Sequence, residues 1–202
     1  KLVEQLRVLE PFGKGNEKPV FADRKLTVRS ANMIGKNKNV LKMKVRNIFM
    51  EFLSLAKQRC SVRKYKTDEI EKEKLDKILE AARIAPTAAN AQSQRLLVIS
   101  SQEAKEKLSK GVNYHGAPLA IIVCGDHSDV FVRPFDKKDM VSVDATIVAD
   151  HIVLEAEDLG LSSCWLTYFD PEIIRNEFNI PSNLEPIAII AVGYADTEKA
   201  SP

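Results

Sequence analysis

Residues 118–124 read Pro-Leu-Ala-Ile-Ile-Val-Cys, a continuous apolar run that predicts a buried strand. A second run, Glu-Pro-Ile-Ala-Ile-Ile-Ala-Val at residues 185–192, predicts the last strand of the chain. Shorter β-type runs lie at residues 95–100 and 163–167. These four runs are the expected strands of the main part of the molecule.

Helical patterns lie between these strands. Residues 75–82 carry apolar side chains at i, i+3, i+4 and i+7, and Pro86 ends that helix. Residues 144–159 are apolar over much of a helical circumference, which is typical of a helix in a core or at a subunit interface, and Gly160 ends it. Further helices are expected to end near Gln58-Arg59, to span residues 102–110, and to begin at Asp170-Pro171. The alternation predicts an α+β or α/β layered fold.

The composition sets limits on the class of protein. The chain has 202 residues, of which 45% are apolar, and it contains neither a run of about 18 apolar residues nor a secretory signal pattern. Its three cysteines and three histidines show no metal-ligand spacing. We therefore expect a cytoplasmic protein with no metal and no membrane segment.

Charge divides the chain into two parts. Residues 1–46 hold 12 Lys and Arg against 4 Asp and Glu, a net charge of +8, whereas the remainder carries −6. Extended runs at residues 20–33 and 40–45 follow an expected helix at residues 3–9. This pattern predicts a short β-rich appendage, residues 1–46, in front of a main domain, residues 47–202.

The front segment resembles the start of the C-terminal OB-like domain of the RecJ single-strand exonucleases. The resemblance rests on Leu-Glu-Pro-Phe-Gly-Lys-Gly-Asn at residues 9–16 and on Ile-Gly-Lys at residues 34–36. RecJ nuclease chemistry needs metal-binding clusters that this chain does not carry, so no nuclease activity is implied. An OB barrel needs five strands, and we expect this fragment to have no function of its own. A single-stranded nucleic-acid-binding module is the alternative that the basic charge leaves open.

Three polar residues follow the first helix of the main domain. Arg59, Ser61 and Arg63 alternate in a segment read as extended, so their side chains can face one ligand. Arginine suits a phosphate because its planar guanidinium donates two hydrogen bonds at once. A solvated basic surface would give the same pattern.

A loop of small residues, 85–92, follows the helix that Pro86 ends. Its Asn90 and Gln92 offer amides that both donate and accept hydrogen bonds, as the pyrimidine edge of a flavin requires. Turn formation is the alternative role for an asparagine in such a loop.

The combined pattern resembles the FMN-dependent nitroreductase family over about residues 50–195. Its segments are Arg-Cys-Ser-Val-Arg-Lys-Tyr and residues 75–92, 116–126, 150–171 and 185–194. The resemblance implies a central, mostly antiparallel sheet flanked by helices, and a homodimer in which the loop of Asn90 serves the flavin of the second subunit. Ser93-Gln94 stand where many members have Pro-Trp.

The resemblance also assigns roles to residues. Arg59 and Ser61 would hold the FMN phosphate and ribityl end, with Cys60 between them as a bystander, and Arg63 would lie near N1 and O2 of the ring. Pro86, Thr87, Asn90 and Gln92 would line the ring edge, and the backbone of Trp165, Leu166 and Thr167 would approach C4a and N5. No catalytic side chain is implied, because the flavin carries the chemistry.

The expected function is ping-pong hydride transfer from NADH or NADPH, through FMN, to a small conjugated acceptor such as a nitroaromatic or a quinone. A flavin-binding protein without turnover is a further alternative. Nucleic acid and membranes are not expected partners. The sequence chooses neither NADH nor NADPH, since it contains no GxGxxG motif.

Overall fold

The computed structural model describes residues 26–34, 40–47 and 52–197. The chain separates into two units, Lys1–Glu51 and Phe52–Pro202. In the first unit, β1 (Leu26–Ile34) and β2 (Val40–Asn47) form an antiparallel pair with a register shift between Val28 and Ser30. The run expected at residues 40–45 is confirmed as a strand, and the run expected at residues 20–33 is confirmed from Leu26 onward, since residues 20–25 lie outside the described residues. The helix expected at residues 3–9 lies outside the described residues.

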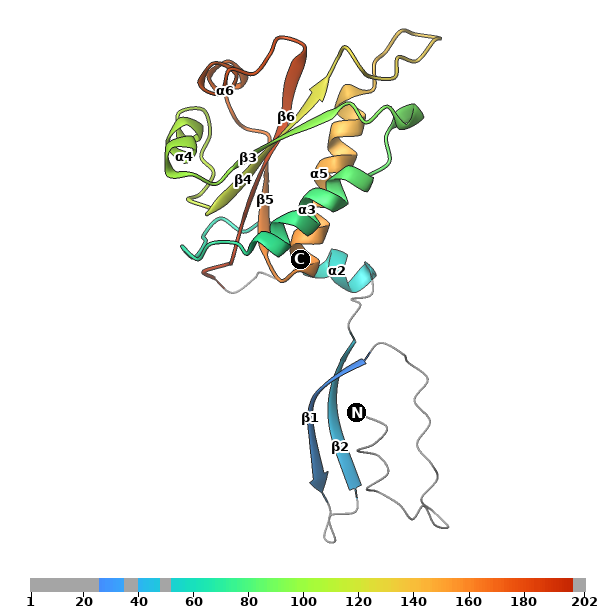
Figure 1. Cartoon of the computed structure of the whole chain (residues 1–202), viewed down its shortest axis with the longest axis vertical. Coiled ribbons are helices and arrows are strands. Elements are labelled where there is room, and N and C mark those ends of the chain that lie inside the picture. The colour runs from blue at the N-terminus through green and yellow to red at the C-terminus, as the bar shows by residue number, and fades with distance from the viewer. Residues whose placement is uncertain (1–25, 35–39, 48–51, 198–202) are drawn as a thin grey trace. The chain divides into compact units, whose positions relative to one another are not determined.

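The second unit is built around a four-stranded antiparallel sheet in the order β3-β4-β6-β5 (Figure 1). The strands are β3 (Gln94–Ile99), β4 (Leu119–Asp126), β5 (Ser162–Leu166) and β6 (Leu184–Gly193). The helices are α2 (Phe52–Gln58), α3 (Lys72–Ile84), α4 (Gln102–Ser109), α5 (Val141–Asp158) and α6 (Pro171–Phe178), with a 3₁₀ turn η1 (Ala88–Asn90) after α3. The α+β class and the antiparallel sheet expected from the sequence are both confirmed.

Helices cover both faces of this sheet (Figure 1). Every residue of β4 is buried, and its side chains alternate between two cores because successive strand residues point to opposite faces. Leu119, Ile121 and Val123 pack with α3 and α5, whereas Ala120 and Ile122 pack with α4 and α6. This double coverage explains why the strand is apolar at every position but one.

Local signals set the helix ends where the sequence places them. The Asp170 carboxylate accepts the N–H groups of Glu172 and Ile173, both at 3.0 Å, so α6 begins with the expected N-cap. After α5, Gly160 takes a positive φ of 75° and Leu161 N–H donates back to Ala156 O at 2.9 Å. Pro86 follows α3 within two residues. No helix in the described ranges is long and apolar enough to cross a bilayer.

The buried face of α5 is expected to contribute most to stability. Ile152 is fully buried in the core beneath α3, so Ile152→Ala should lower the free energy of unfolding by about 2–5 kcal/mol. Urea denaturation measures the difference. Asp150→Ala, at an exposed position of the same helix, is the control and should change the value by less than about 0.5 kcal/mol. Equal effects of the two substitutions would contradict this account of the core.

Candidate functional site

The basic segment after α2 lies against the edge strand β5. Val62 N–H donates to Ser163 O at 3.0 Å, and Ser61 forms a parallel bridge with Ser163. Val62 is buried, while the flanking Ser61 and Arg63 are exposed, so the alternation expected from the sequence is present. Arg59 is half-buried directly after the helix. The segment therefore presents two cations and a hydroxyl at the sheet edge.

Tyr65 fastens the other end of this segment. Its hydroxyl donates to Val62 O at 2.8 Å, and Lys66 N–H donates to Tyr194 O at 2.9 Å just beyond β6. Burial is the main cause that raises the pKa of Tyr65 above its ordinary value. A Cβ on Gly193 would lie 2.9 Å from Tyr65 Cδ1, so only glycine allows the ring this close to β6.

The end of β5 supplies the third part of the site. Trp165 and Leu166 are half-buried and pack on the two cores, whereas Thr167 is exposed. Tyr168 follows with 98% of its surface exposed. The side chains of Trp165 and Leu166 are thus partly taken up by the cores, and Thr167 and Tyr168 are the exposed residues that follow them.

His115 lies near Arg63, although no role was predicted for it from the sequence. Burial first, and then the charge of Arg63, lower the pKa of His115 below its ordinary value. Its backbone has a φ of 59°, and its N–H donates to Asn113 Oδ1 at 3.0 Å. No sequence spacing signals this proximity, because 52 positions separate the imidazole from the guanidinium.

The structure does not bring the loop of Asn90 to the basic segment within one chain. The loop follows α3, whose 13 residues rise about 20 Å, and it lies beside the N-terminal end of α5, whereas α2 lies beside the other end (Figure 1). Pro86, Asn90 and Gln92 are exposed and Thr87 is half-buried. The two groups of predicted flavin contacts therefore lie apart.

The backbone of this loop is strained. Ala89, Asn90 and Gln92 have φ values of 52–53°, a region that L residues avoid at a cost of about 1–3 kcal/mol each. Short-range bonds offset part of the cost: Gln92 N–H donates to Thr87 Oγ1 at 3.0 Å, and Asn90 N–H donates to Thr87 O at 2.9 Å. Strain of this kind persists where the surrounding structure holds the loop in place.

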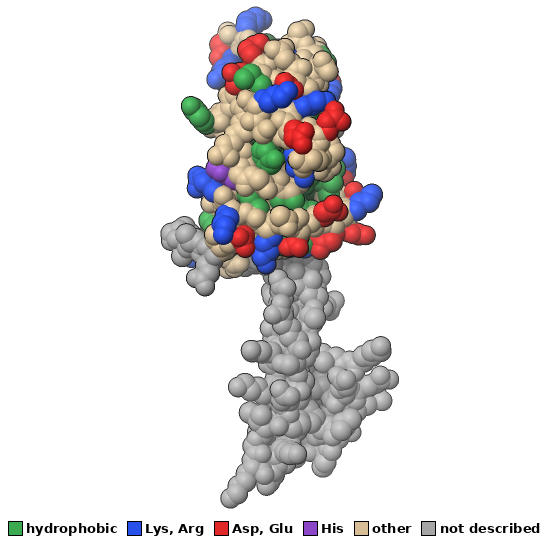
Figure 2. All heavy atoms as spheres, turned by 90° about the vertical axis from the view of Figure 1, so that its left-hand side faces the viewer, with side chains coloured by type: hydrophobic (Ala, Val, Ile, Leu, Met, Phe, Trp, Pro, Cys, Tyr) green, Lys and Arg blue, Asp and Glu red, His purple; other side chains and the backbone are tan. Residues whose placement is uncertain are grey.

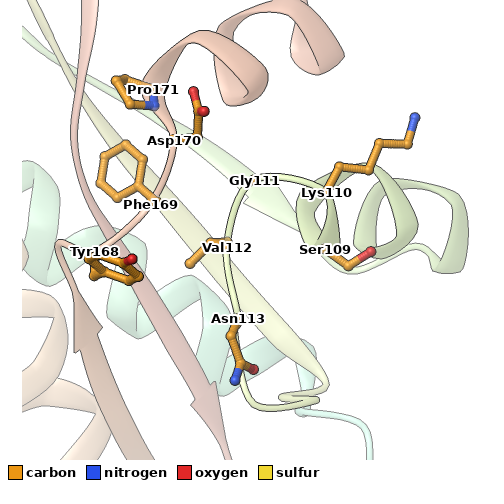
Figure 3. A pocket seen from close by; sticks show the side chains of 9 residues that line it. All are labelled: Ser109, Lys110, Gly111, Val112, Asn113, Tyr168, Phe169, Asp170 and Pro171. Atoms are coloured by element: carbon orange, nitrogen blue, oxygen red, sulfur yellow. The ribbon is translucent and has the colours of Figure 1, made fainter.

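A cavity of about 580 Å³ opens beside Tyr168. Its walls come from two segments (Figure 3), which are Ser109, Lys110, Gly111, Val112 and Asn113 on one side and Tyr168, Phe169, Asp170 and Pro171 on the other. Val112 points into the gap toward the two aromatic rings, while Lys110 points away, where it pairs with Glu177 at 2.8 Å. Asp170 N–H joins the two segments by donating to Gly111 O at 2.9 Å. The cavity thus has an aromatic wall on the β5 side.

Charge is evenly mixed on the face that carries α4 and α6. Figure 2 shows Lys and Arg interspersed with Asp and Glu over this face. Pairs such as Lys107 with Glu103, at 2.8 Å, account for part of the mixing. This face therefore offers no broad basic surface of the kind that nucleic-acid binding needs.

Within the described residues, no group of His, Cys, Asp and Glu could hold a metal ion. The three cysteines are free thiols. Burial raises the pKa of Cys124 to about 11 and raises that of Cys164 as well, so both are poor nucleophiles at neutral pH.

Comparisons with known proteins identify the family. The description "Nitroreductase family" matches residues 56–113 and 110–194, and "RecJ OB domain" matches residues 1–55. A nitroreductase family protein of Clostridium difficile 630 is 53% identical, with a TM-score of 0.75 over 76% of this chain and 89% of that chain. An FMN-dependent nitroreductase of C. difficile R20291 is 38% identical, with a TM-score of 0.63 over 74% and 91%. A Methanothermobacter thermautotrophicus protein, provisionally named an NADH dehydrogenase/NAD(P)H nitroreductase, is 34% identical over 72% of this chain and 78% of that protein.

The chain belongs to the nitroreductase family, and it is an enzyme of the nitroreductase type, an oxidoreductase. Both resemblances seen in the sequence are confirmed, that of the front segment to the RecJ OB domain included. Sequence reasoning assigned no role to His115, to Tyr168 or to Asp144, a buried residue of α5 whose Oδ1 accepts the N–H of Ala88 at 2.9 Å. The position of Asp144, an acidic residue at the start of a largely apolar helix, was a signal for it in the sequence. The roles of His115 and Tyr168 depend on contacts and exposure that no sequence pattern encodes.

His127, at the start of the loop between β4 and α5, contacts two carboxylates, an arrangement that we call the histidine clamp. Its contribution to stability should depend on pH. His127 Nε2 lies 2.8 Å from Glu185 Oε2, and Nδ1 lies 3.0 Å from Asp139 Oδ2. The bond to Glu185 is the main cause that raises the pKa of His127 above 6.5, and Asp139 adds to it. The clamp therefore stabilises the fold below the ordinary pKa, and this contribution is lost as the pH rises through the raised value.

NMR titration of the His127 ring should accordingly give a pKa above 6.5. Glu185→Gln should lower this pKa more than Asp139→Asn, because the bond to Glu185 is the larger cause. The loss of stability that comes from deprotonation of the His127 ring, as the pH rises from acidic to alkaline, should be absent in His127→Gln. The change is expected to be small, about two- to fivefold in the unfolding equilibrium, since the ring is 40% exposed. An unshifted ring in the wild type would contradict the clamp.

Proposed function

We propose that the chain binds FMN and transfers hydride from NADH or NADPH to a small conjugated acceptor, as a homodimer. The observation that carries this proposal is the position of Arg59 and Arg63 at the edge of β5. Within the described part of the chain, neither guanidinium has a carboxylate partner. By contrast, the neighbouring Lys64 is paired with Asp196 at 2.9 Å. Two such cations beside a serine hydroxyl fit a flavin mononucleotide, with Arg59 and Ser61 for its phosphate end and Arg63 for its ring.

The residues divide the binding between the two ends of the cofactor. Arg59 and Ser61 would hold the phosphate and ribityl chain, with Cys60 between them making no catalytic contribution. Arg63 would stand near N1 and O2 of the ring, where a fixed cation favours the reduced, negatively charged form. When bound, FMN supplies the hydride chemistry, accepting from the nicotinamide and donating to the acceptor.

The backbone of Trp165, Leu166 and Thr167 would contact the C4a–N5 region of the flavin. The packing supports this assignment, since the Trp165 and Leu166 side chains are engaged in the cores. The acceptor would bind beside Tyr168, whose exposed ring and adjoining cavity suit a flat molecule. At about 580 Å³, the cavity lies within the usual range of small-molecule sites.

A second copy of the chain would complete the ring edge. Pro86, Thr87, Asn90 and Gln92 lie at the opposite end of α3 from the basic segment. This separation supports a composite site, in which a flavin held by Arg59 and Ser61 of one subunit would meet these four residues of a partner subunit. Each dimer would form two such composite sites, as twofold symmetry requires.

Absorbance spectroscopy tests cofactor binding directly. Purified protein should show flavin absorbance that NADH or NADPH bleaches, and Arg59→Ala with Arg63→Ala should weaken FMN binding about 100-fold, since each charge-assisted bond contributes about tenfold. Fluorescence quenching of added FMN measures the affinity. Arg83→Ala is the control, because Arg83 is an exposed arginine of α3 paired with Glu80. Affinity that stays within a few-fold in the double variant would refute the phosphate assignment, and FMN retained without bleaching would show a flavin binder lacking turnover.

Subunit complementation tests the composite site. One chain carries Arg59→Ala and Arg63→Ala, and the other carries Asn90→Ala and Gln92→Ala, so that neither forms an intact site alone. Random mixing makes about half of the dimers mixed, each with one intact site, which should restore about one quarter of the wild-type flavin sites. Titration with FMN counts the sites. No gain on mixing would show that both clusters act within one chain or that the loop makes no contact.

A further inference from the structure

Asp144 is a buried carboxylate in the first turn of α5 that the proposed function does not use. The residue is 1% exposed. Its Oδ1 accepts the N–H of Ala88 at 2.9 Å, a bond between positions 56 residues apart. Its Oδ2 is buried and has no hydrogen-bond partner in the part of the chain that the structure describes. A half-paired buried carboxylate is costly, so its presence requires a compensating role.

The start of α5 is a suitable place for an acidic side chain. Asp144 N–H donates to Met140 O at 2.9 Å, which places the carboxylate at the N-terminal end of the helix. Met140, the N-cap residue, provides no side-chain cap. The positive end of the helix dipole therefore favours a negative charge at this position. The hydrogen bond from Ala88 at 2.9 Å then ties this end of the helix to the turn before β3.

Ala88 is the first residue of the strained turn that carries Asn90. Ala89, Asn90 and Gln92 all have positive φ, and the bonds from Gln92 to Thr87 Oγ1 and to Arg83 O are local ones. The bond to Asp144 is of a different kind, because it fixes the turn to α5, a long helix of the core. It therefore sets where the two amide side chains stand relative to the rest of the subunit.

We propose that Asp144 is the positioning residue of the flavin ring-edge loop: its carboxylate holds Ala88 so that Asn90 and Gln92 keep their strained conformation before a ligand arrives. The inference rests on the proposed function for the identity of the ligand. The ordering of the loop itself is independent of any ligand. In a composite dimer, Asp144 of one subunit would act on the flavin whose phosphate the partner subunit holds.

The test compares three variants with the wild type. Asp144→Ala removes the acceptor, Ala88→Pro removes the donor, and Asp144→Asn retains an oxygen acceptor. Proline suits position 88, which opens η1 and follows Thr87 in an extended conformation with ψ 157°. Asp150→Ala, at an exposed position of α5, is the matched control.

Two measurements are made on each variant. The first is amide hydrogen exchange at Asn90 and Gln92 without flavin, alongside urea unfolding of the whole protein. The second is FMN affinity, together with the absorption spectrum and midpoint potential of the bound flavin. The spectrum and potential report contacts at the ring edge, which a loss of global stability alone would not change.

We expect Asp144→Ala and Ala88→Pro to speed exchange in the loop at least tenfold, to weaken FMN binding about tenfold and to shift the spectrum. Asp144→Asn should stay within about threefold of the wild type, and Asp150→Ala should match it. Unchanged exchange in both disrupting variants would overturn the inference, as would an Asp144→Asn variant as weak as Asp144→Ala. If the wild type binds no FMN, the proposed function fails, while loop exchange still decides the role of Asp144.

Discussion

The antiparallel pairing of β4 with β6 is the interaction on which the rest of the main unit depends. Its register places Ile121 opposite Ile190 on the side of α3 and α5, and Ile122 opposite Ile189 on the side of α4 and α6. A slip of one residue would exchange the two faces and leave both helical layers without their partners. Because this strand pair is buried on both sides, it fixes the helices at the same time as the sheet.

The two halves of the candidate site derive from this arrangement in different ways. The basic segment is held by the sheet, since Val62 bonds to β5 and Tyr65 packs over Gly193 at the end of β6. The loop of Asn90 is held instead by a helix, through the bond from Ala88 to Asp144. Both ties attach a segment outside the main helices and strands to an element of the buried core. Such attachment is what preorganised binding requires.

The separation of these halves has a functional meaning. One subunit carries Arg59 and Arg63 at one end of α3 and the exposed amides of Asn90 and Gln92 at the other. Under the proposed function, a second copy of the chain would bring the two groups together at one flavin. The cations, the β5 backbone and the aromatic wall would then come from one subunit, and the hydrogen-bonding amides from its partner.

Short-range patterns in the sequence determined the elements and the family. The apolar run at residues 118–124, the stop at Pro86 and the cap at Asp170 act over a few positions, so their outcome could be predicted without the fold. The combined motifs over about residues 50–195 indicated the nitroreductase family. Packing between distant residues decided the rest. The exposure of Tyr168, the charge of Arg63 beside His115 and the bond from Ala88 to Asp144 follow from how helices settle on the sheet. No local periodicity carries that information, because each contact joins or exposes residues that only the completed core brings to their places.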